Sequence, residues 1–276
     1  MPALPSGPLG KAELTQIAGH LGERVRRAVS IEVWTREESG LVTGDRDTGA
    51  HAADALALCR QLAGLHPALS ITAYDLDRHA DRAQRAGIDL SPTIVLRSGG
   101  RSVVLSGMFY GPLFAPFLDA IVFLSVGTTP VKAETRQALA ALEGDVRIEA
   151  FVTPFDPFSE RMAPLLLAFA AESKRVKLRM VEASQFPVLA GQRLLTEVPV
   201  LVMNDKRIAG YWEEDGLVEQ VSRIAAGNDA PVIRERVLVA EYVSEDEARS
   251  IAQEQQAAQA AQPQTTSSGL IIPGQE

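Results

Sequence analysis

Apolar and polar positions divide residues 11–126 into short helical and extended segments. Apolar side chains recur at Leu14, Ile17, Leu21 and Val25 with nearly helical spacing, so we expect a helix there. The same criteria predict further elements in this order: strand 31–34, helix 51–65, strand 69–74, helix 77–86, strand 93–96, strand 102–105 and helix 113–124. Residues 36–49 are polar and contain glycine, which is typical of a loop.

The same succession of elements recurs in the second half of the chain. It comprises strand 146–152, helix 156–171, strand 176–181, helix 187–195, strand 200–203, strand 207–210 and helix 213–226. We therefore predict an internal repeat of one unit with the order β-α-β-α-β-β-α. Thr153 follows Thr35 by 118 residues, but Pro199 follows Pro92 by only 107. The first copy thus has extra residues, which we place in the loop at 36–49.

Residues 151–164 read Phe-Val-Thr-Pro-Phe-Asp-Pro-Phe-Ser-Glu-Arg-Met-Ala-Pro. Pro154 ends the preceding strand, because proline cannot continue a hydrogen-bonded ladder. We expect Asp156 to cap the following helix through its carboxylate, and Pro157 is tolerated in a first helical turn. Pro164 is expected to kink this helix.

This stretch resembles the active site of thioredoxin and glutaredoxin relatives, and above all that of the double-domain protein disulfide oxidoreductases. In that family the turn reads Thr-Pro-x-Cys-Pro-Tyr-Cys, whereas here Asp156 takes the place of the nucleophilic cysteine and Ser159 that of the resolving cysteine. Residues 107–111, Gly-Met-Phe-Tyr-Gly, look like the family's Phe-Tyr-Gly segment. Glu197-Val198-Pro199 resembles its cis-proline turn, where the backbone pairs with an extended substrate.

The resemblance covers roughly residues 11–226 and implies an α/β fold of two tandem thioredoxin-like domains, with mixed sheets flanked by helices. We expect domain 1 at 1–127, domain 2 at 128–230, and an added strand, a weak helix and a flexible tail at 231–276.

Cysteine usage decides against dithiol chemistry. Disulfide exchange needs a thiolate and a second thiol, but Cys59 is the single cysteine and lies inside a predicted helix. Cys59 is interpreted as a small buried hydrophobe, with a single reactive thiol as the alternative. Asp156 and Ser159 also admit a hydrolytic pair, but no histidine follows His79 to serve as a base. We therefore interpret them as a helix cap and an inert vestige.

Composition narrows the remaining classes. The 276 residues include 35 acids and 27 bases, a net charge of -8, without a long basic cluster, so we expect no nucleic-acid binding. No apolar run is long enough for a membrane span, and Met1 to Gly10 lacks the pattern of a signal peptide, so we expect a cytoplasmic protein. The four histidines show no metal-ligand spacing, and we predict neither a metal nor a cofactor.

A protein or peptide partner is the remaining hypothesis. The candidate groove comprises residues of the Asp156 turn and of the cis-proline turn, together with Trp212: Pro154, Phe155, Pro157, Phe158, Val198, Pro199 and Trp212. The alternative is that each proline only shapes its turn. Residues 232–243 are β-branched enough for an added strand, which pairs either within the chain or across a homodimer.

The C-terminal residues offer a second candidate. A capping box at Ser244 and Glu247 precedes helix formers from 248 to 261. The tail beyond contains an apolar cluster, Leu270, Ile271 and Ile272, interpreted as a docking motif or a frayed terminus. We therefore expect a redox-inactive protein that binds a peptide or acts as a scaffold. The alternative is a thiol-disulfide or stress-related redox protein that uses Cys59 or the thiols of a partner.

Overall fold

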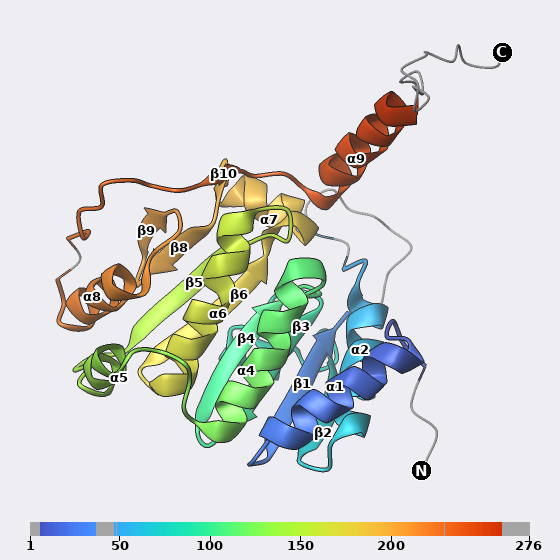
Figure 1. The fold of residues 1–276 in the computed structure, drawn as a ribbon, viewed down its shortest axis with the longest axis horizontal. Coiled ribbons are helices and arrows are strands. Elements are labelled where there is room, and N and C mark those ends of the chain that lie inside the picture. The colour runs from blue at the N-terminus through green and yellow to red at the C-terminus, as the bar shows by residue number, and fades with distance from the viewer. Residues whose placement is uncertain (1–5, 37–46, 48, 229, 261–276) are drawn as a thin grey trace, which may run out of the picture. The chain divides into compact units, whose positions relative to one another are not determined.

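The computed structural model describes residues 6–36, 47, 49–228 and 230–260 (Figure 1). Leu270, Ile271, Ile272 and most of the predicted loop at 36–49 lie outside the described residues. The helices of the first half are α1 (Lys11–Arg24), α2 (Ala52–Leu65), α3 (Ala80–Ala86) and α4 (Phe114–Val126), with the short 3-10 helix η1 (Gly111–Leu113) before α4. Those of the second half are α5 (Ala133–Ala140), α6 (Pro157–Glu172), η2 (Ala183–Gln185), α7 (Pro187–Gln192) and α8 (Glu214–Ala225).

Eight strands form one mixed sheet in which the two halves repeat each other. Its order is β2-β1-β3-β4-β6-β5-β8-β9. The first four are β1 (Val29–Thr35), β2 (Leu69–Asp75), β3 (Thr93–Ser98) and β4 (Arg101–Ser106). The others are β5 (Val146–Val152), β6 (Val176–Glu182), β8 (Val200–Met203) and β9 (Lys206–Ala209). Each half pairs its first two strands in parallel and its remaining pairs antiparallel. The parallel pairing of β4 with β6 joins the halves.

Alternation along the strands sends side chains to two different cores. Ile31 and Val33 of β1 belong to the main core, which spans both halves and lies under α1, α2, α4, α6 and α8. Trp34 points to the opposite face, where it packs with residues of α3 and with Val95. In the second half, Phe151 packs on this opposite face with residues near α7. The two halves are therefore covered in the same way, by large helices on one face and a short helix on the other.

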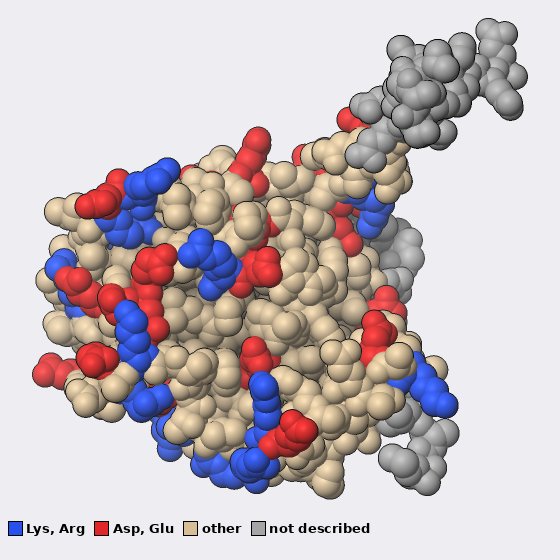
Figure 2. Space-filling model, viewed as in Figure 1, with Lys and Arg blue, Asp and Glu red and all other residues tan. Residues whose placement is uncertain are grey.

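Figure 1 shows α4 and α6 side by side in front of the centre of the sheet, and these two helices pack against each other. On the face shown in Figure 2, acidic and basic side chains are interspersed, and few charges lie over α4. Within the described ranges, no helix is long and apolar enough to cross a membrane.

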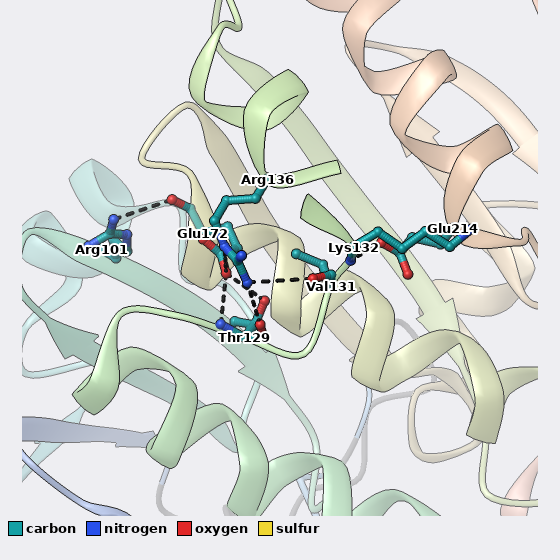
Figure 3. A network of polar contacts seen from close by, with 7 residues as sticks. All are labelled: Arg101, Thr129, Val131, Lys132, Arg136, Glu172 and Glu214. Atoms are coloured by element: carbon teal, nitrogen blue, oxygen red, sulfur yellow. Dashed lines mark hydrogen bonds and ion pairs between the residues drawn. The ribbon is translucent and has the colours of Figure 1, made fainter. Parts of the chain in front are cut away.

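The connector between the halves is held by the polar network of Figure 3. The carboxylate of Glu172, at the end of α6, accepts hydrogen bonds from the backbone N–H of Thr129 at 2.7 Å and from the Arg136 Nε at 3.2 Å. Arg136 also donates to the Thr129 carbonyl at 2.8 Å, and Arg101 of the first half donates to the Glu172 carbonyl at 3.3 Å. Glu172 thereby fixes the connector against both halves.

The structure corrects two predicted segments. Helix α5 was not expected, because only Thr135 and Leu139 of this short polar segment are buried. Residues 232–243 were expected to form a strand, but only β10 (Ala240–Glu241) is one, and it pairs within the chain with β7 (Glu197–Val198). The strand β7 is only two residues long, which limits the ladder.

The first unit of the chain ends at Tyr242, and the described residues from Val243 onward belong to a second unit. Its helix α9 (Glu245–Ala260) follows the predicted capping box. Ser244 Oγ accepts from the Glu247 N–H at 3.3 Å, and the Glu247 carboxylate accepts from the Ser244 N–H at 2.8 Å. The predicted division at residues 127 and 230 stays a prediction.

Candidate functional site

The Asp156 turn, residues 153–159, lies between the end of β5 and the first turn of α6. One oxygen of the Asp156 carboxylate accepts from the Phe158 N–H at 2.9 Å, and the other accepts from the Ser159 N–H at 2.7 Å. Asp156 is therefore the predicted N-cap of α6. Pro157 occupies the first helical position and Pro164 lies inside the helix, as expected.

Asp156 and Ser159 do not form a hydrolytic pair. Asp156 is 2% exposed and Ser159 is fully buried. The Ser159 hydroxyl makes no hydrogen bond, and the carboxylate contacts only the backbone N–H of this serine. A nucleophile needs a base that takes its proton and access to substrate, so this serine lacks both.

The outer residues of the turn are accessible. Phe155 is 46% exposed, which is unusual for a large aromatic side chain. Pro157 is exposed, and Pro154 and Phe158 are half-buried. These four residues of the predicted groove thus present apolar surface beside the capped helix.

The two predicted proline turns are repeated features of the halves. The Ser91-Pro92 and Val198-Pro199 peptide bonds are both cis. The Pro199 carbonyl accepts from the Gly210 N–H at 2.7 Å, and the Pro92 carbonyl accepts from the Gly107 N–H at 2.8 Å.

The edge beside Pro199 is occupied by the chain itself. Residues 232–242, named the strap here, run along the second half, and Ala240 and Glu241 pair antiparallel with Val198 and Glu197. The pairing continues with the Tyr242 N–H, which donates to the Thr196 carbonyl at 3.1 Å. The backbone position that the sequence predicted for an extended substrate therefore carries residues of the strap.

Arg234 anchors the start of the strap. Its guanidinium donates to the carbonyls of Tyr211 at 2.9 Å and Ala209 at 2.5 Å. It also lies 3.8 Å from the centroid of the Trp212 ring, a cation–π contact. Partial burial lowers the pKa of this guanidinium, which stays charged at neutral pH because arginine does so in proteins generally.

Two further hydrogen bonds and a close backbone approach hold the rest of the strap. The Tyr211 N–H donates to the Leu238 carbonyl at 2.9 Å, and the Tyr242 hydroxyl donates to the Ala183 carbonyl at 3.2 Å. Gly210 has a φ of +88°, and a Cβ there would lie 2.8 Å from Val237. The strap thus follows the backbone of residues 209–211 closely.

One residue of the predicted groove is not available to a ligand. Trp212 is 1% exposed, belongs to the main core and is covered by Arg234, so its assignment as a groove contact was wrong. The side chains of Val198 and Pro199 are also buried, which leaves their backbone as the means of recognition.

The single thiol lies in the main core. Cys59 on α2 is fully buried, and burial raises the pKa of its thiol to about 12. A thiolate is therefore scarce at neutral pH, and the hypothesis of a reactive Cys59 is disfavoured.

Sequence reasoning missed Asp47, which connects the halves on the other face of the sheet. Its carboxylate accepts from the backbone N–H groups of Val188 at 2.8 Å and Leu189 at 3.2 Å, in the first turn of α7. Burial raises the pKa of Asp47 despite these bonds. Asp47 and the first turn of α7 are far apart in the sequence, so no local pattern could have predicted this contact.

Comparison with solved structures identifies the fold. A protein disulfide oxidoreductase from Aeropyrum pernix aligns with a TM-score of 0.68 at 21% identity, over 83% of this chain and 98% of that one. The NTD_N/C domain of the alkylhydroperoxide reductase AhpF from Enterococcus faecalis aligns with a TM-score of 0.64 at 18% identity, over 78% of this chain and 100% of that one. No protein-family model and no curated protein matches. The chain therefore has a tandem thioredoxin-like fold, and these identities carry no activity to it.

Proposed function

We propose that this chain is a redox-silent thioredoxin-fold protein that binds an extended segment of a protein partner. The segment adds to β7 as an antiparallel strand, and its side chains contact the Asp156 turn. The observation that carries this proposal is the pairing of Glu197 and Val198 with β10, because it supports the ability of this edge to accept a strand.

The chemistry of the site also favours binding over dithiol exchange. At the two positions where similar proteins have their redox cysteines, this chain has Asp156, which caps α6, and the buried Ser159. Its only cysteine is a core residue. What remains accessible is apolar surface, with Phe155 as its most prominent side chain. Exposed aromatic side chains commonly anchor bound peptides.

Binding is tested with a carboxymethylated unfolded protein as the probe, since it offers extended segments without thiols. Fluorescence anisotropy is expected to show saturable binding by the wild type. Phe155→Asp is expected to weaken it about tenfold, because a charge replaces the apolar contact. Ile251→Asp is the matched control, since Ile251 is also an apolar residue with 46% exposure. Equal binding by both variants would remove the Asp156 turn from the site.

Redox silence is tested separately by insulin reduction with dithiothreitol. The wild type and Cys59→Ser are both expected to stay at the uncatalysed rate. Turnover that disappears in Cys59→Ser would contradict the proposal and establish a thiol enzyme.

A further inference from the structure

We propose that the strap is a displaceable internal ligand, which closes the β7 edge until a partner segment replaces it. This inference rests on the proposed function, and it adds a regulatory state to the same site. The segment that competes with the partner for this edge is the chain's own residues 238–242, which already occupy it through backbone pairing.

The strap is held by backbone hydrogen bonds, by the side chains of Arg234 and Tyr242, and by the partial burial of Val232 and Tyr242 against the cores. None of its residues is fully buried, and Ile233 is 97% exposed and Val237 53% exposed, so its apolar residues contribute little burial. Arg234 instead provides two charge-assisted hydrogen bonds and the contact with Trp212. A segment with few buried apolar contacts opens at a low free-energy cost compared with the core.

A tethered segment competes strongly with a free one. Its effective concentration is in the millimolar range for a short link, so it lowers the apparent affinity of any other strand for β7. The apparent dissociation constant equals the intrinsic constant divided by the fraction of molecules whose edge is open. Loosening the strap must therefore tighten the binding of an added segment, although no residue of the edge itself has changed.

The experiment uses a fluorescein-labelled peptide with the sequence of residues 232–243, added to full-length protein. Arg234→Ala removes the anchor and is expected to bind the peptide about tenfold more tightly than the wild type. Arg236→Ala is the matched control, because it removes the same charge from the same strap at an exposed position. It is expected to bind as the wild type does.

Hydrogen exchange verifies that the variant acts on the strap. The amides of Tyr211 and Tyr242 form hydrogen bonds between the strap and the rest of the second half, so they are expected to exchange faster in Arg234→Ala. The amides of β5 are expected to stay protected, which distinguishes an opened strap from an unfolded domain.

The outcomes separate this inference from the proposed function. Equal binding of the peptide by wild type and Arg234→Ala, or unchanged exchange at Tyr211 and Tyr242, overturns the inference that the strap closes the β7 edge. The proposed function then still stands if the unfolded probe binds. If the exchange shows an open strap but Arg234→Ala binds neither the peptide nor the unfolded probe, both proposals are overturned. A dimer of Arg234→Ala built by exchange of straps supports displacement, with a second copy as the occupant.

Discussion

Both oxygens of the Asp156 carboxylate accept hydrogen bonds from backbone N–H groups in the first turn of α6, so this residue stabilises the start of the helix. An N-terminal cap satisfies backbone N–H groups that have no partner within the helix, and a negative charge there also interacts favourably with the helix dipole. Use of this carboxylate as a proton acceptor would disrupt the same turn. The residue that replaces a nucleophile is thus a structural one.

Asp156→Ala is expected to lower the free energy of unfolding by about 1–2 kcal/mol, because a buried and a partly buried N–H group lose their acceptor. Urea denaturation measures the change. Glu160→Ala is the control from the same turn, where an exposed charge contributes only a few tenths of a kcal/mol. A similar loss in both variants would mean that charge alone, without the cap, stabilises α6.

Cys59 should link stability to alkaline pH. Burial raises the thiol pKa from its ordinary 9.0 to about 12 in the folded protein. Below pH 9 the thiol is protonated in both states, so the stability is fully present. Above it, only the unfolded chain releases the proton, and stability falls by up to about 1.4 kcal/mol per pH unit until the folded pKa is reached.

The measurement is the difference in unfolding free energy between the wild type and Cys59→Ala from pH 8 to pH 10.5. It is expected to shrink as the pH rises, because the variant lacks the thiol. A constant difference would show that the thiol ionises equally in both states. Thiol reagents at pH 8 are expected to label only the unfolded wild type.

Among the elements, those with a strong apolar period were predictable and the others were not. The strands of both halves and the large helices follow from their patterns. β1 ends at Thr35 and α2 begins at Ala52, whereas β5 ends at Val152 and α6 begins at Pro157, so more residues separate the first pair of elements than the second. Helix α5 could not be predicted, because its two buried residues are too few to give a helical period of apolar positions. Residues 232–243 have the composition of a strand, but an extended segment forms a ladder only where another edge is free.

The course of the strap depends on Gly210. Gly210→Ala is expected to loosen the strap, because the residue has a φ of +88° and the new Cβ would overlap Val237. Gly227→Ala is the control, since its φ is +79° but nothing lies within 4 Å of the added atom. The cost of placing a Cβ at a positive φ, about 1–2 kcal/mol, is common to both variants.

The difference between these two variants therefore isolates the contact with the strap. Hydrogen exchange of the Tyr211 amide is expected to quicken in Gly210→Ala and to stay unchanged in Gly227→Ala. If both variants exchange alike, the strap does not depend on close approach at Gly210.

At the scale of the whole molecule, the sequence predicted a repeat but not how the copies join. The pairing of β4 with β6 and the reach of Asp47 to α7 are contacts between distant residues, and neither leaves a local pattern. The same holds for the site: the cap at Asp156 is local and was predicted. The occupied β7 edge comes from the tertiary packing of the strap, and the burial of Trp212 comes from the main core together with Arg234.

One sheet and one main core that spans both halves imply a single cooperative unfolding transition for the unit that ends at Tyr242. The chain provides a probe for each half, since Trp34 lies in the first half and Trp212 in the second. In Trp212→Phe and Trp34→Phe, the remaining tryptophan is expected to report the same urea midpoint as near-ultraviolet circular dichroism, to which tyrosines of both halves contribute. The comparison within each variant removes the cost of the substitution itself. An earlier transition at either tryptophan would show that the β4–β6 pairing and the Glu172 network do not couple the halves, and that each half unfolds independently.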